Sequence, residues 1–173
     1  MYYLTIYGVA EVADRYIDRH AAGAATRHDD TFRALAFLHQ RGRRVAWETF
    51  ALLSNGFPNG AMARARTLHE LAVIGTVIGE YGRQPATSNL ATRFLDYEVI
   101  EELRACEGGY SDFVADEHYV KELRKRGEVL TEQYKPPFVE RNGWAAILNS
   151  GEPPSFKQLE ALAEWRGCGA STK

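Results

Sequence analysis

Apolar residues recur every three to four positions through most of the chain, and this spacing predicts amphipathic α-helices. No segment alternates between apolar and polar residues for long enough to predict a β-strand. Clusters of glycine, proline and asparagine interrupt the pattern and divide it into segments of helical length. The predicted helices span residues 3–20, 31–54, 59–80, 87–106, 116–134 and 155–165.

These six segments predict an all-α fold, built as a single helical bundle of five to six helices. Thr31 and Ser155 stand where helix N-caps are expected, and Asn55-Gly56 stands where a helix would end. A chain of 173 residues is long enough for one domain. We assign that domain to residues 1–166 and predict a disordered tail over 167–173.

The composition fits a folded helical protein, because 23 Ala and 15 Leu favour helix over sheet. The formal net charge of -2 excludes an acidic tail or a generally basic nucleic-acid-binding surface. Cys106 and Cys168 are too few for a disulfide framework or a structural zinc site. The N-terminus does not resemble a signal peptide, and no apolar stretch approaches about 20 residues. We therefore expect a cytoplasmic protein without a membrane partner.

Several motifs that carry chemistry are absent from the sequence. There is no glycine-rich dinucleotide-binding or P-loop motif, and no Gly-x-Ser-x-Gly nucleophile elbow. None of the five histidines lies three residues after a glutamate, and no two histidines are four residues apart. Di-iron helices and His-Glu-x-x-His zinc helices are thereby excluded as local motifs. We expect neither a cofactor nor a metal ion.

The helix predicted over residues 59–80 is mostly apolar on all sides, which predicts a buried position at the centre of the bundle. Arg66 and Glu70 are four residues apart in it and therefore share one face. A buried charge needs a partner, and this pair can supply it. The pair is either a structural ion pair, with Arg66 reaching Asp96 or Tyr97, or part of a polar pocket for a ligand or substrate.

The same segment carries a resemblance to a known family. Residues 60–70 read GAMARARTLHE and are followed by RFLDY at residues 93–97. These runs resemble a widespread uncharacterised family of bacterial helical proteins, whose core is Arg-Ser/Thr-Leu-x-Glu followed by aromatic-x-x-Tyr on the next helix. The matching positions are Arg66, Thr67, Leu68, Glu70, Phe94 and Tyr97. Residues 142–145, read as NGWA, resemble the tryptophan-containing loop of that family.

The resemblance covers roughly residues 32–162, and it implies no activity because the family has none established. The chemistry of the matching polar positions must therefore be argued from the residues themselves. We take four of them together as a candidate pocket, either substrate-binding or structural: Arg66, Glu70, Arg93 and Tyr97.

Arg64 and His69 carry a second resemblance, to the HEPN ribonucleases, whose signature is an arginine and a histidine with four to six residues between them. Arg15 and His20 have the same spacing. The resemblance implies small all-α homodimers that cut RNA without a metal and act in toxin–antitoxin and phage-defence systems. In such a site the histidine is the general acid or base, and the arginine stabilises the charge on the phosphorane. Ala65 departs from the polar residue that usually follows the arginine.

Arg64 and His69 lie about 140° apart around a helix axis, so one helix cannot bring them face to face. A ribonuclease site would therefore need copies from two chains. Two hypotheses follow: a catalytic homodimer acting on RNA, with an antitoxin as its protein partner, or a non-catalytic module that binds a partner protein or small ligand. The sequence does not decide whether the chain is an enzyme.

Overall fold

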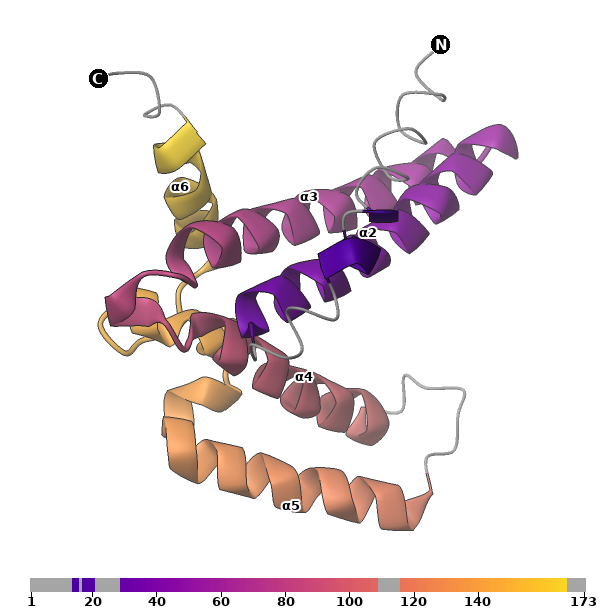
Figure 1. Cartoon of the computed structure of the whole chain (residues 1–173). Coiled ribbons are helices and arrows are strands. Elements are labelled where there is room, and N and C mark those ends of the chain that lie inside the picture. Colours follow the sequence, from indigo (N-terminus) through magenta and orange to yellow (C-terminus); the bar gives the residue numbers. More distant parts are fainter. Residues whose placement is uncertain (1–13, 16, 21–28, 109–115, 168–173) are drawn as a thin grey trace, which may run out of the picture. The chain divides into compact units, whose positions relative to one another are not determined.

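The computed structural model describes residues 14–15, 17–20, 29–108 and 116–167. Within these residues it contains helices and no strand, which confirms the all-α fold (Figure 1). The chain divides into two compact units, residues 1–79 and 80–173. The single domain over 1–166 stays a prediction. Most of the helix expected over 3–20, and the tail from residue 168 onward, lie outside the described residues.

The first unit contains helix α2, Asp30–Ser54, and helix α3, Pro58–Tyr81, which continues just past the boundary of the unit. The two helices form an antiparallel hairpin (Figure 1). A Cβ atom added at Gly75 of α3 would lie 3.9 Å from the Leu38 side chain of α2, so the glycine permits close packing there. The residues of α2 that face this core are Thr31, Ala34, Leu38 and Val45.

The ends of α2 confirm one sequence expectation and correct another. Asp29 is the N-cap, because its side chain accepts a hydrogen bond from the Phe32 backbone N–H at 2.9 Å. The expected cap, Thr31, instead lies inside the helix and is buried. At the other end α2 stops at Asn55 and Gly56, as expected, and Gly56 has the positive φ of 78° that favours glycine.

Helix α3 is less buried than its apolar composition predicts. Only Ala61, Val73, Val77 and Ile78 are buried along its 24 residues. Its first half is exposed, and the Met62 side chain is 74% exposed. The expectation of a helix buried on all sides is therefore wrong. The alanines of this half make the segment apolar without supplying large side chains that would bury much surface.

The second unit begins with a short 3-10 segment, η1, Pro85–Thr87, and contains helix α4, Leu90–Glu107, and helix α5, Glu117–Tyr134. Two further 3-10 segments follow, η2, Pro136–Val139, and η3, Gly143–Leu148, before helix α6, Phe156–Gly167. Ser155 caps α6 as expected, because its hydroxyl oxygen accepts from the Gln158 backbone N–H at 3.4 Å and its own N–H donates to the Gln158 side chain at 2.7 Å. The largest fully buried side chains of this unit are Leu90, Leu123, Phe138, Trp144 and Leu159.

Helices α4 and α5 lie side by side (Figure 1). Gly127 is buried on α5, and a Cβ atom added there would lie 3.5 Å from Ile100 and 3.6 Å from Leu103 of α4. The missing side chain lets the two helices approach closely at this point. An ion pair also joins the two helices, since the Arg124 guanidinium binds Glu107 of α4 at 2.6 Å.

Gly143 fixes the turn between η2 and η3. A Cβ atom there would stand 2.3 Å from the carbonyl oxygens of both Pro137 and Phe138, closer than any real contact allows. The residue before it, Asn142, has a φ of 61° and donates from its side-chain amide to the Pro154 carbonyl at 2.9 Å. The tight turn thus depends on a glycine and on a residue that tolerates the left-handed region.

Candidate functional site

Arg64 and His69, the expected ribonuclease residues, are both exposed on α3. The Arg64 side chain is 49% exposed, and its Nε lies 2.9 Å from a carboxylate oxygen of Glu48 on α2. The five-residue spacing places His69 about 140° around the helix from Arg64. The structure therefore leaves the two side chains accessible but does not bring them together in one chain.

Arg66 and Glu70 form an ion pair, at 3.4 Å between Nε and a carboxylate oxygen. The pair is not buried as expected, because the Arg66 side chain is 80% exposed and that of Glu70 33% exposed. The reason is the exposed first half of α3. An exposed pair one helical turn apart contributes little to stability, about 0.3–0.5 kcal/mol.

Arg93 lies in a different environment, buried on α4 with 8% of its surface exposed. Its Nε donates to the Trp144 carbonyl oxygen at 3.0 Å, and its Nη2 donates to the Gly143 carbonyl oxygen at 3.2 Å. The guanidinium also lies 4.6 Å from the centre of the Tyr134 ring. Burial lowers the pKa of Arg93 from its ordinary value. All these contacts hold α4 to the loop and helix that follow it, so Arg93 has a structural role.

Tyr97 is the second buried member of the expected pocket. Its hydroxyl donates to the Glu140 carbonyl oxygen at 2.7 Å and accepts from Arg104 at 2.9 Å. Its ring meets the Phe138 ring edge-on, with 5.6 Å between centres. Burial is the largest of the effects that raise the pKa of Tyr97 to about 12. The neighbouring Asp96, expected as a partner of Arg66, accepts from the Tyr134 hydroxyl at 2.7 Å.

The four residues of the expected pocket therefore divide between two kinds of contact. Arg66 and Glu70 form an exposed pair in the first unit, whereas Arg93 and Tyr97 are buried anchors in the second. The motif Asn142-Gly143-Trp144 serves this contact, because the carbonyl oxygens of Gly143 and Trp144 accept hydrogen bonds from the Arg93 guanidinium.

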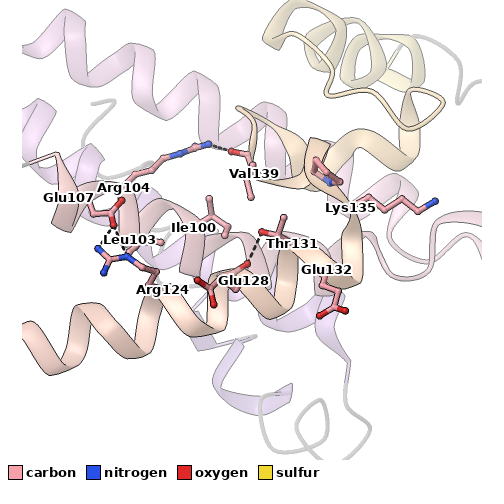
Figure 2. A pocket seen from close by; sticks show the side chains of 12 residues that line it. Ile100, Leu103, Arg104, Glu107, Arg124, Glu128, Thr131, Glu132, Lys135 and Val139 are labelled. Carbon is pink, nitrogen blue, oxygen red and sulfur yellow. Dashed lines mark hydrogen bonds and ion pairs between the residues drawn. The ribbon is translucent and has the colours of Figure 1, made fainter.

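A groove beside these anchors was not expected from the sequence. It lies between α4 and α5, reaches η2 and has a volume of about 800 Å³ (Figure 2). Its apolar lining comes from Ile100, Leu103, Gly127, Pro136 and Val139. Its polar lining comes from Arg104, Glu107, Arg124, Glu128, Thr131, Glu132 and Lys135.

Arg104 closes one edge of the groove. Its guanidinium reaches across to the Val139 carbonyl oxygen (Figure 2), and it also binds the Tyr97 hydroxyl and the Glu101 carboxylate. Glu107 and Arg124 form the ion pair at another edge. Gly127 was the one signal in the sequence for the contact between α4 and α5 beside this groove, since a glycine inside a helix commonly marks a close approach.

Metal and membrane sites find no support in the described part of the chain. No group of three or more His, Cys, Asp and Glu side chains is placed there to hold a metal ion. None of the helices described has the length and apolar character needed to span a bilayer.

The fold and the groove define an all-α protein of two helical units. In the second unit a buried arginine, Arg93, is hydrogen-bonded to the backbone carbonyl oxygen of Trp144. Residues 32–165 match a family of unknown function, DUF5677, and the chain belongs to that family. The resemblance seen in the Arg-Thr-Leu-x-Glu segment is thereby confirmed. The comparisons with curated proteins and with solved structures gave no match.

Proposed function

We propose that this chain is a non-catalytic binding module and that the groove between α4 and α5 is its ligand site. The groove itself carries the proposal. Its volume of about 800 Å³ falls in the range of small-molecule sites, and its floor is apolar with polar groups at the edges. Two of the residues that line it, Arg124 and Glu107, form an ion pair with each other.

The charges at the groove favour a ligand with a cationic group. Glu128 and Glu132 lie one turn apart on α5, and neither carboxylate makes a hydrogen bond or ion pair within the described part of the chain. Glu132 points away from the groove (Figure 2), so Glu128 is the anion beside it. The last turn of α5 contains no basic residue, although the C-terminal end of a helix favours positive charge. Lys135 follows the helix, but its side chain leads away from the groove (Figure 2). We infer an amphipathic amine with an apolar body.

The test uses three probes of equal chain length: octylamine, octanoate and octanol. We expect octylamine to bind more tightly than the other two in titration calorimetry. Thr131→Trp fills the groove and should abolish binding, whereas Val129→Trp, on the outer face of the same helix, should not. Glu128→Gln should weaken octylamine selectively. Equal binding of octylamine and octanoate, or wild-type binding by Thr131→Trp, would contradict the proposal.

A metal-independent ribonuclease is the second candidate, because Arg64 and His69 are both exposed and therefore accessible to RNA. The active unit would be a homodimer in which each chain supplies one of the two residues. The engagement of Arg64 with Glu48 counts against a free phosphate-binding arginine.

The ribonuclease is tested with single-stranded RNA in the presence of a chelator. His69→Ala should abolish cleavage, and His118→Ala, which changes an exposed histidine on α5, should not. Cleavage that survives in His69→Ala, or its absence from the wild-type protein, removes this candidate.

A further inference from the structure

The tip of the α2–α3 hairpin exposes three large apolar side chains. Leu53 is 57% exposed, Phe57 61% and Met62 74%. They come from the last turn of α2, the connecting turn and the start of α3, so they gather at one end of the hairpin. Apolar side chains exposed together in this way mark a contact surface.

Charge is absent from this tip. Residues 49–63 contain no Asp, Glu, Lys, Arg or His, so 15 consecutive residues are uncharged. Beyond the tip the balance is positive, since residues 41–70 contain five arginines and two glutamates. Of these arginines, Arg41 and Arg44 make no ion pair within the part of the chain that the structure describes. The hairpin thus combines an apolar end with a basic region behind it.

Several backbone N–H groups of this turn are already hydrogen-bonded within the hairpin. The N–H groups of Asn55, Gly56 and Phe57 donate to carbonyl oxygens of α2, and Pro58 has no N–H. Backbone donors that are already bonded lower the cost of moving a segment out of water. This pattern is the ordinary C-terminal end of a helix, and it leaves few backbone donors to desolvate when the tip enters an apolar phase.

We propose that this hairpin tip binds the surface of an anionic lipid membrane as a shallow wedge. Met62 lies four residues into α3, about 6 Å from the start of the helix at 1.5 Å per residue. Interfacial segments bury their apolar side chains about 5–10 Å deep, which matches this layer. Arg64 and Arg66 lie about 9 and 12 Å from the same end, but each pairs with a glutamate. The attraction to anionic lipid therefore rests on the net positive charge of residues 41–70 as a whole. The contact is peripheral and requires no spanning helix.

The experiment is cosedimentation of the full chain with vesicles of phosphatidylcholine containing phosphatidylglycerol, and with vesicles of phosphatidylcholine alone. We expect binding to the anionic vesicles and weaker binding to the neutral ones. Replacing one inserted side chain, as in Phe57→Ser, should reduce the partition coefficient about tenfold or more, because burial of a large apolar side chain is worth about 1.5–3 kcal/mol.

The matched control is Val129→Ser, which removes a side chain that is 58% exposed on α5. It should leave vesicle binding unchanged, and circular dichroism should show both variants folded. Failure of the wild-type chain to bind anionic vesicles would overturn the proposal, as would equal effects of the two variants. Self-association that Phe57→Ser abolishes, without vesicle binding, would also overturn it and identify the tip as a contact between proteins.

Discussion

The Arg93 Nε donates a hydrogen bond to the backbone carbonyl oxygen of Trp144 at 3.0 Å, across 51 residues of sequence. A second bond from the same guanidinium reaches Gly143, and the Tyr134 ring lies beside it. One buried side chain therefore joins α4, the end of α5 and the loop that follows. A buried cation is stable here because carbonyl oxygens and aromatic rings replace the water it has lost.

We expect Arg93→Ala to lower the free energy of unfolding by about 2–4 kcal/mol, because it leaves two buried carbonyl oxygens without a donor. Arg93→Lys should recover part of this loss, since an ammonium cannot reproduce the planar fork. The exposed Arg66→Ala is the control and should change stability by no more than about 0.5 kcal/mol. Urea unfolding followed by circular dichroism measures all three. Equal losses for Arg93→Ala and Arg66→Ala would show that burial does not distinguish the two arginines.

Gly143→Ala should destabilise the protein by more than about 2 kcal/mol, because its methyl group would occupy the place of two backbone carbonyl oxygens. Gly79→Ala provides the comparison, since a Cβ atom added at Gly79 meets nothing within 4 Å and alanine favours helix. The melting temperature of Gly143→Ala should therefore fall, whereas that of Gly79→Ala should rise or stay unchanged. A normal melting temperature for Gly143→Ala would contradict the turn geometry.

The pKa of Tyr97, raised to about 12 by burial first of all, predicts a dependence of stability on alkaline pH. The folded state holds the phenolic proton more tightly than the unfolded state, whose pKa is about 10. The stability that Tyr97 contributes is therefore complete below pH 10 and is lost as the pH rises toward 12. Denaturant unfolding of the wild type and Tyr97→Phe should show a difference that shrinks over this interval. A difference independent of pH would contradict the assignment.

The helix pattern of the sequence predicted most of the fold. The boundaries of α2, α4 and α5 fall within a few residues of those expected, because apolar spacing and the turn residues act locally. The burial of α3 was predicted wrongly, since an alanine-rich segment reads as apolar whether or not it has a partner. Periodicity identifies a face of a helix, but the partner of that face depends on contacts distant in sequence.

The candidate pocket shows the same limit. Arg66 and Arg93 both stand in segments rich in apolar residues, yet one is 80% exposed and the other is buried. The difference arises from Gly143 and Trp144, which supply the carbonyl oxygens to Arg93 from 50 and 51 residues away. No local pattern around Arg93 contains that information. The groove between α4 and α5 was likewise missed, because it is formed by two helices and a loop together.

The tight turn at Gly143 has a use in recognising related chains. A glycine whose Cβ position is occupied by two backbone carbonyl oxygens, followed by a tryptophan and preceded 50 residues earlier by an arginine, is a spacing pattern that reports the contact between α4 and the loop. Distant homologues that keep the pattern should share the arrangement of α4 and its loop even where the remaining sequence has diverged. Homologues with a larger residue at this position should have rebuilt the loop and lost the arginine with it.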